Sequence, residues 1–318
     1  MSDLVSIIIP NYNGEEILKK NLPKVFDSIS LYKGGKTEVI VIDDCSVDNS
    51  INVLKNLEIK MLSSHPNIKF KIIKNAKNLG FASNVNKAVK SANGNILVLL
   101  NTDAFPKNDF LNPLIKHFTD PNIFAVGCMD ESLESGKTIL RGRGIGSWKR
   151  GFLVHSRGEV DRTNTLWVNG GSGAFRKSIW EKLGGFDSIY NPFYWEDIDL
   201  SYRALKSGYK IVFEPNSIVV HEHEKGVIKR KFSLSKIKSI AYRNQFIFVW
   251  KNATDLNLQF LHIFWLPYHL IKALIRGDWN FFVGFCLAFL RLPQVILSSF
   301  KAQKYFIKSD KEIVKDFI

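Results

Sequence analysis

Residues 96–100, Ile-Leu-Val-Leu-Leu, form an apolar run that is followed directly by Asn101, Thr102 and Asp103. The run has no helical spacing and predicts a strand that is buried on both faces. A carboxylate after such a strand lies at the carboxyl edge of the sheet, where open α/β sheets bind ligands. Asp103 there is suited to hold a hard divalent cation, and capping of the following turn is the alternative interpretation. This stretch therefore predicts an α/β fold with a candidate ligand site at one sheet edge.

Three more apolar runs precede this one and alternate with segments expected to be helical. The strands are expected over residues 5–10, 38–44 and 68–74. Their order predicts a mostly parallel, Rossmann-like sheet with helices on both faces. Polar residues at the strand ends would converge on one crevice, which is typical of a nucleotide site. These residues are Pro10, Tyr12, Asp44 and Asp103.

The usual phosphate-binding loops are missing from this predicted nucleotide site. No Gly-x-Gly-x-x-Gly follows the first strand, and no Gly-x-x-x-x-Gly-Lys-Ser/Thr motif occurs. Dinucleotide and Walker-type sites are therefore disfavoured. Another source of positive charge is needed for a diphosphate, and a metal ion on Asp103 would supply it.

The last third of the chain is basic and rich in apolar residues. From residue 225 onward there are 16 Lys or Arg and 5 Asp or Glu, a net charge of +11 out of +14 for the whole chain. Two strongly apolar blocks, residues 258–272 and 281–293, are flanked by basic residues, with Trp265 and Trp279 near their ends. Both are too short or too broken to span a bilayer comfortably. They predict helices that lie on an anionic membrane, with an ordinary helical subdomain as the alternative.

The remaining composition favours a protein of the cytoplasm. Three widely separated cysteines, Cys45, Cys128 and Cys286, argue for a reducing compartment and against a disulfide framework. The chain enters a strand almost at once, so no signal peptide is expected, and no confident transmembrane helix is expected either. Aromatic residues of the basic tail lie in apolar blocks rather than between Lys and Arg, which argues against nucleic-acid binding.

A second acidic segment follows the aromatic run at residues 190–195. A helix beginning near Glu196 would place Asp199 and Arg203 one turn apart, where they can pair. Asp197 would then lie at the helix N-terminus, where the dipole favours its ionised form. An ionised carboxylate facing a cleft is a candidate general base, and acidic decoration of a helix start is the alternative. Because sugars pack on aromatic faces, the preceding run favours the general base.

Two further features have open interpretations. Gly170 and Gly171 permit either a close approach of the backbone to another group or simply a tight bend. Residues 210–213 and 217–223 are expected to be two strands, the second ending in His221 and His223. A histidine in that position is a structural residue or a ligand.

In their order along the chain, these segments resemble family 2 glycosyltransferases with a GT-A fold, particularly bacterial polysaccharide enzymes of the rhamnosyltransferase-like type. The resemblance implies a GT-A domain over residues 1–225. Beyond it, the composition of residues 226–318 predicts a basic, apolar helical extension that associates with membranes. The matching segments are residues 5–14, 39–50, 78–84, 101–103, 170–186 and 195–203.

The resemblance also implies roles for individual residues. Asp197 matches the family's general base. Asp103 matches the last acid of the Asp-x-Asp metal motif, whose first acid is replaced here by Asn101. His221 matches a histidine that in some members completes the coordination of Mg²⁺ or Mn²⁺, with His223 as the competing candidate. The residues expected to bind the nucleotide sugar are Pro10, Tyr12, Asp44, Asn78, Asp103, Gly171, Trp195 and Glu196.

The predicted function is a metal-dependent, inverting hexosyl or rhamnosyl transfer. The donor would be a UDP- or dTDP-sugar, and the acceptor a hydroxyl of a lipid-linked or growing cell-surface polysaccharide. The enzyme would attach peripherally to the inner face of the cell membrane. A nucleotidyltransferase that makes sugar nucleotides is one alternative, but it would need a Gly-rich loop with a basic residue, which residues 11–14 lack. A nucleic-acid-binding protein that uses the basic tail is the other.

Overall fold

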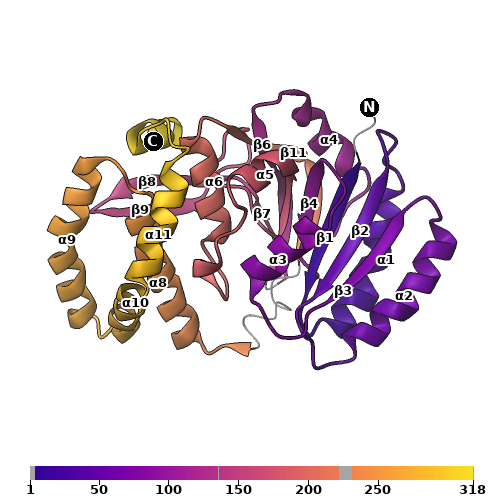
Figure 1. The fold of residues 1–318 in the computed structure, drawn as a ribbon, viewed down its shortest axis with the longest axis horizontal. Helices are drawn as coiled ribbons and strands as arrows, with labels where there is room; N and C mark the ends of the chain where they lie inside the picture. Colours follow the sequence, from indigo (N-terminus) through magenta and orange to yellow (C-terminus); the bar gives the residue numbers. More distant parts are fainter. Residues whose placement is uncertain (1–3, 135, 222–230, 318) are drawn as a thin grey trace.

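The computed structural model describes residues 4–134, 136–221 and 231–317. Its centre is a nine-stranded mixed sheet in the order β3-β2-β1-β4-β10-β6-β11-β5, with β7 paired to β6 (Figure 1). A separate hairpin is formed by β8 (Gly144–Lys149) and β9 (Phe152–Arg157). The strands of the main sheet are β1 (Val5–Asn11), β2 (Thr37–Asp43), β3 (Lys69–Lys74), β4 (Ile96–Leu100), β5 (Ala104–Pro106), β6 (Ile123–Glu134), β7 (Lys137–Arg141), β10 (Ser172–Arg176) and β11 (Lys210–His221).

The parallel arrangement predicted from the sequence is present in β1 to β4. Strands β3, β2, β1 and β4 are all parallel, with Ile8 opposite Ile40 and Leu99. Beyond β4 the sheet becomes mixed, because β10 is antiparallel to both of its neighbours, β4 and β6. The two strands expected after residue 210 are in fact one strand, β11, which continues through a shift in pairing between Glu214 and Ile218.

Successive side chains of a strand point to opposite faces of the sheet, and helices cover both faces here. Ile7 and Val39 belong to a core under one set of helices, and their neighbours Ile8 and Ile40 belong to a core under another. The first set is α1 (Glu15–Ile29), α2 (Ser50–Ser64) and α4 (Leu111–Ile115), and the second is α3 (Phe81–Lys90), α5 (Lys177–Lys182) and α6 (Glu196–Lys206).

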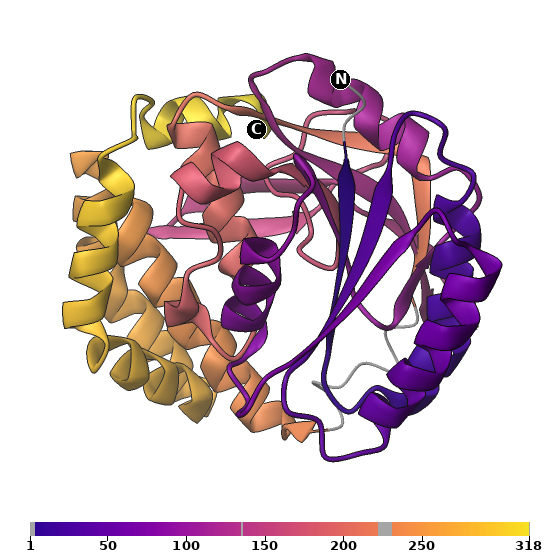
Figure 2. The same ribbon diagram turned by 45° about the vertical axis from the view of Figure 1, so that its right-hand side comes forward.

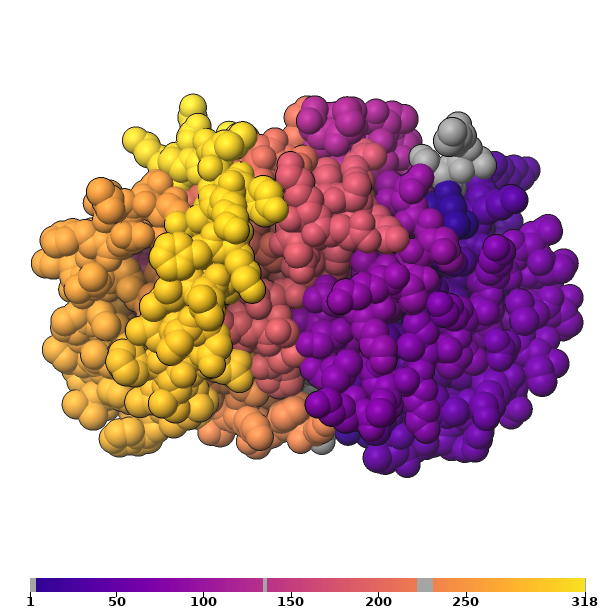
Figure 3. Space-filling view, viewed as in Figure 1, coloured from indigo at the N-terminus to yellow at the C-terminus, as the bar shows by residue number. Residues whose placement is uncertain are grey.

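The C-terminal helices form the other end of the molecule from β3 and α2 (Figures 1 and 2). In the space-filling view the orange and yellow helical part and the indigo-to-purple N-terminal part occupy opposite ends of one face (Figure 3). The helices are α8 (Leu234–Asn252), α9 (Leu256–Ile275), α10 (Trp279–Phe289), α11 (Leu292–Gln303) and α12 (Asp310–Val314).

These helices are joined to the sheet domain by a third core and by buried charges. Tyr202 of α6 and Phe248 of α8 lie in the same apolar cluster as the β8–β9 hairpin. Lys206 of α6 pairs with Asp310 of α12 at 3.0 Å, and both side chains are fully buried. An uncompensated buried charge is costly, so this pairing ties the C-terminal helices to α6. The boundary expected near residue 225 stays a prediction.

One of these helices corrects an expectation from the sequence. By length and composition alone, α9 is long and apolar enough to cross a membrane, and the pair α10 and α11, bent by 67°, would pass the same test together. The sequence suggested a block too short or too broken to do so. The difference arises because the helix runs unbroken through Pro267 for 20 residues.

Candidate functional site

A cavity of about 680 Å³ lies beyond the carboxyl ends of β1, β2 and β4. All ten residues singled out from the sequence line it, although they come from distant parts of the chain. They are Pro10, Tyr12, Asp44, Asn78, Asp103, Gly171, Trp195, Glu196, Asp197 and His221. The volume is within the usual range for a small-molecule site. The structure therefore brings the predicted residues together, whereas their individual roles stay predictions.

Asp44 fixes the loop that borders one end of the cavity. Its Oδ1 accepts a hydrogen bond from the Leu79 backbone N–H at 2.8 Å, and its Oδ2 accepts one from Gly80 at 2.9 Å. Asn78 in turn donates to the backbone carbonyl of Asp44 at 3.1 Å. Gly80 has φ +80°, a conformation that favours glycine. Asp44 thus organises the cavity wall. Its Oδ1 also accepts from Asn75 Nδ2 at 2.9 Å, so Oδ2 is the oxygen that retains a lone pair for a ligand.

Asp103 and His221 meet on another wall of the cavity. His221 Nε2 lies 3.1 Å from Asp103 Oδ1, and His221 Nδ1 lies 2.9 Å from Oδ2 of buried Asp130. Burial alone would lower the pKa of His221, but its hydrogen bonds to the two carboxylates raise that pKa to about 10. His221 is therefore protonated at neutral pH when no cation is present.

The residues at this wall fit a cation that is shared with substrate phosphates rather than one that is bound by protein ligands alone. Across the described part of the chain, no group of three or more His, Cys, Asp or Glu side chains is arranged to hold a metal ion. Asp103 and His221 provide one carboxylate and one imidazole, and Asp130 would orient the imidazole from behind. Mg²⁺ commonly binds through one or two carboxylates together with substrate phosphates. His223, the competing candidate, lies outside the described residues.

Gly171 allows a close approach of two backbone segments at the cavity. Its carbonyl accepts a hydrogen bond from the Asn101 backbone N–H at 2.9 Å. A Cβ atom at Gly171 would lie 2.3 Å from Asn101 Nδ2, which is far inside van der Waals contact. Of the two interpretations of the paired glycines, the structure supports close approach.

Asp197 lies in the first turn of α6 and borders the cavity. Its carboxylate accepts hydrogen bonds from the Ile198 N–H at 2.8 Å and the Gly170 N–H at 3.3 Å. Burial raises the pKa of Asp197, and these backbone hydrogen bonds only partly oppose the shift. The sequence analysis expected the helix dipole to favour ionisation, but desolvation prevails. A carboxylate whose pKa is raised toward neutrality is better matched to proton abstraction.

Glu196, the neighbour of Asp197, is buried, and its Oε2 has no hydrogen-bond partner among the described residues. Burial and then the nearby Asp197 charge raise its pKa well above the usual value, so its neutral form is favoured. The predicted pairing of Asp199 with Arg203 is confirmed, at 2.7 Å. That pair holds α6 in place behind the two cavity carboxyls.

The backbone before α6 is strained and is held by α8. Tyr194 and Trp195 have φ of 71° and 75°, in the left-handed region that bulky residues avoid. The Asn244 side chain on α8 donates from Nδ2 to the carbonyl oxygens of Tyr190, Phe193 and Tyr194. A C-terminal helix therefore braces the loop that delivers Asp197 to the cavity.

The cavity lining also includes residues that the sequence analysis did not single out, among them His155, Trp167, Lys231 and Phe232. His155 on β9 contacts Trp167 and Trp195 edge to face, with ring centroids 5.2 Å and 4.9 Å apart. Burial lowers the pKa of His155, which favours a neutral imidazole. Lys231 Nζ lies 4.1 Å from the ring centroid of Tyr12. No strand-end or motif signal marks these residues, because packing of the hairpin and of the segment before α8 brings them to the cavity.

Comparison with known proteins gives a family match over most of the sheet domain. The family described as "Glycosyl transferase family 2" matches residues 6–184. Over 69% of its length, the chain is 25% identical to the O-antigen chain rhamnosyltransferase RfbN of Salmonella typhimurium, of which the match covers 66%. It thus spans less than two thirds of that relative.

A second relative matches more of the chain, including part of the C-terminal helices. It is a dolichyl N-acetyl-α-D-glucosaminyl phosphate 3-β-D-2,3-diacetamido-2,3-dideoxy-β-D-glucuronosyltransferase of Methanococcus voltae, 26% identical over 86% of this chain and 82% of its own length. Among solved structures, the mannosyltransferase PcManGT of Pyrobaculum calidifontis, in complex with GDP-Man and Mn²⁺, superposes with a TM-score of 0.56 at 19% identity. That superposition covers 99% of this chain and 84% of PcManGT. It establishes a shared GT-A-like fold.

Proposed function

The chain belongs to glycosyl transferase family 2, and from that premise we propose that it transfers a sugar from a nucleoside diphosphate sugar to a hydroxyl of a lipid-linked or growing polysaccharide. The observation that carries this proposal is the single cavity lined by Asp44, Asp103, His221 and Asp197. Candidate groups for the nucleotide, the diphosphate and proton removal therefore border one continuous space. The relatives that act on O-antigen chains and on a dolichyl-linked sugar support the acceptor class.

Asp197 acts as the general base in this proposal. As the acceptor oxygen forms its bond to the anomeric carbon, the bond from that carbon to the diphosphate breaks, and the bonding pair leaves with the nucleoside diphosphate. The hydroxyl proton passes to the Asp197 carboxylate. A single displacement from the opposite face inverts the anomeric configuration. The Gly170 and Ile198 N–H groups hold the carboxylate in position for this step.

Asp103 and His221 would hold Mg²⁺ or Mn²⁺. When bound, the cation supplies positive charge that stabilises the leaving diphosphate. His221 must lose its proton before its Nε2 can bind a cation, and Asp130 keeps the ring oriented through Nδ1. Mn²⁺ in the solved relative is consistent with this choice of metal.

The acceptor sugar is assigned to the aromatic wall beside Asp197. His155, Trp167 and Trp195 line the cavity, and His155 contacts both tryptophans edge to face, so the three rings form one packed group. The His155 ring lines the cavity, where it can meet a sugar hydroxyl. Tyr12, Asp44 and Asn78 would border the nucleotide at the other end. A lipid-linked acceptor would bring the enzyme to a membrane surface, and we propose that this is the cytoplasmic face.

Release of nucleotide from a panel of UDP-, dTDP- and GDP-sugars tests the proposed function. Each donor is assayed with a polysaccharide or lipid-linked acceptor fraction, in Mn²⁺, in Mg²⁺ and in EDTA. We expect turnover of one donor that requires the divalent cation. No turnover of any donor, together with no binding of any of the three nucleoside diphosphates, would contradict the proposal.

A further inference from the structure

The outer face of α9 exposes a continuous apolar stripe. Phe260, Phe264, Ile271 and Ile275 recur at spacings that place them on one side of the helix, and each is between 57% and 79% exposed. The exposure of large apolar side chains at helical spacing marks an interaction surface rather than an ordinary solvated helix.

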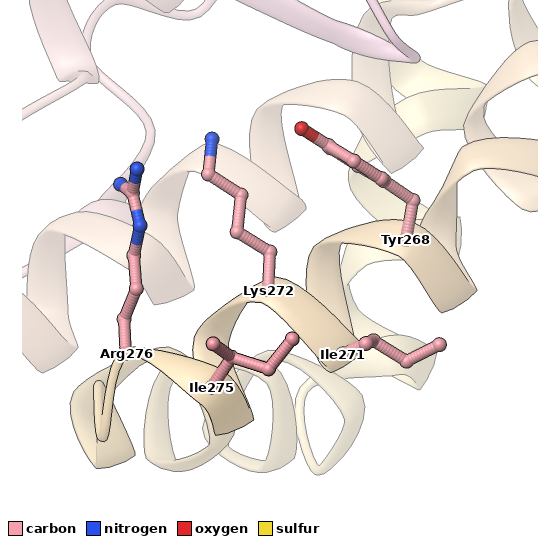
Figure 4. A pocket seen from close by; sticks show the side chains of 5 residues that line it. All are labelled: Tyr268, Ile271, Lys272, Ile275 and Arg276. Atoms are coloured by element: carbon pink, nitrogen blue, oxygen red, sulfur yellow. The ribbon is translucent and has the colours of Figure 1, made fainter.

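Basic side chains border this stripe along one edge. In Figure 4, Tyr268, Lys272 and Arg276 extend side by side from the same side of α9, while Ile271 and Ile275 lie on the adjoining face. These five side chains line a shallow pocket of about 240 Å³. Tyr268, Lys272 and Arg276 are four residues apart, so their polar groups lie about one helical turn from each other.

Arg150 adds a third cation, from a different element. It lies in the turn between β8 and β9, where its Nη1 donates to the Tyr268 hydroxyl at 2.6 Å. The guanidinium also lies over the rings of Tyr268 and Trp265, at 4.7 Å and 5.4 Å. Two cations thus lie against Tyr268, because Lys272 Nζ lies 5.7 Å from the same ring, and Arg276 lines the same pocket one turn further along.

The inner side of α9 is occupied by the hairpin, which fixes how the helix can meet a membrane. His262 and His269, two turns apart, contact the backbone carbonyls of Gly151 and Arg150 at 2.8 Å and 2.9 Å. A helix held along one side in this way can lie in a membrane surface with its apolar stripe inward. Its composition also permits a membrane span, but spanning would break these contacts.

We propose that α9 docks flat on a bilayer that contains anionic phospholipid. Arg150, Lys272 and Arg276 would lie against lipid phosphates, and the apolar stripe from Phe260 to Ile275 would lie among the upper acyl chains. Charge selects this occupant, because residues 225–318 carry a net charge of +11. An apolar stripe with a basic border is the pattern that binds anionic membrane surfaces. This membrane surface would be the partner of the proposed glycosyltransferase. The docking proposal rests on the proposed function only for its biological setting, because docking needs neither donor nor acceptor.

Co-sedimentation with vesicles tests the docking face on the full chain. We expect binding to phosphatidylcholine vesicles containing one third phosphatidylglycerol, weaker binding to pure phosphatidylcholine, and weakening by salt. Each basic residue near an anionic surface accounts for roughly a fivefold change in partitioning, so the triple variant Arg150→Gln, Lys272→Gln and Arg276→Gln should bind on the order of 100-fold more weakly. The matched control is Lys55→Gln, Lys60→Gln and Lys69→Gln, at exposed positions on α2 and at the start of β3. It has the same net charge and should bind nearly as wild type.

A second variant tests the apolar contribution without touching the cations. Phe264→Ser and Ile271→Ser alter exposed side chains, so folding should be retained while vesicle binding falls by roughly tenfold or more. Equal losses in the basic triple variant and its control would overturn the proposal. So would lipid-independent self-association that the Phe264→Ser, Ile271→Ser variant abolishes, because the stripe would then bind a second copy. Vesicle binding is scored without donor, so its failure is distinguishable from absence of glycosyl transfer.

Discussion

Asn244 offers a direct test of whether the C-terminal helices position the candidate general base. Its side chain is fully buried on α8 and donates to the Tyr190, Phe193 and Tyr194 carbonyls at 3.1, 2.9 and 2.8 Å. Its Oδ1 accepts from Arg243 Nε at 2.8 Å. Replacement with alanine would remove these contacts from the loop that leads into α6.

The size of the effect follows from the number of protons on the amide. Two N–H groups can make two full hydrogen bonds at a time, each worth about 1 kcal/mol net, and a buried carbonyl left without a donor costs about 1–3 kcal/mol. We therefore expect Asn244→Ala to lower the free energy of unfolding by roughly 3 kcal/mol. The left-handed Tyr194 and Trp195 could then relax, and a displacement of Asp197 by about 1 Å would lower turnover on the order of 100-fold.

Urea unfolding and nucleotide release, both measured where the variant is still folded, check this prediction. Asn244→Asp retains the acceptor for Arg243 but removes both donors, so it should resemble Asn244→Ala in turnover. Asn257→Ala alters an exposed residue of α9 and should stay within about 0.5 kcal/mol of wild type. Unchanged turnover in a folded but destabilised Asn244→Ala protein would refute the positioning role.

Three further predictions address the cavity itself. Because burial raises the pKa of Asp197 and a base must be ionised, turnover should fall on acidification through a pKa above the ordinary 3.8; a pH–rate profile whose acidic limb lies at or below that value would argue against this base. EDTA should abolish turnover and Mn²⁺ restore it, and Asp103→Asn should raise the Mn²⁺ concentration for half-maximal turnover by roughly tenfold or more; an unchanged metal requirement would exclude Asp103 as a ligand. His155→Ala should lower transfer to acceptor by roughly tenfold and spare donor hydrolysis, and equal losses in both assays would place His155 on the donor side.

Strand ends were the part of the site that the sequence could predict. Asp44 and Asp103 follow buried apolar runs, and parallel strands bring their carboxyl ends to one edge of the sheet. Their convergence could therefore be predicted without knowing how the loops fold. Asp197 was found for a local reason, since its helix begins where the acidic cluster begins. The sequence pattern also predicted the Asp199–Arg203 pair, which the structure confirms.

The remaining walls depend on long-range packing that leaves no local pattern. His155 belongs to a hairpin of 14 residues, Gly144–Arg157, whose place is set by contacts such as Phe152 with Phe246 and His262. Asn244 contacts the aromatic loop from 50 to 54 positions away along the chain. The antiparallel direction of β10 was equally hidden, because a short apolar run does not reveal which way its strand pairs.

The most direct test of the proposed chemistry is turnover and nucleotide binding in Asp197→Asn. The substitution keeps the size of the side chain and an acceptor oxygen, but it removes the proton acceptor. Our account predicts that sugar transfer falls by about 10²–10⁴-fold, while the dissociation constant of the released nucleoside diphosphate is unchanged. Asp161→Asn, at an exposed position that does not line the cavity, should transfer at the wild-type rate. Transfer by Asp197→Asn at the wild-type rate would contradict the assignment of Asp197 as the base.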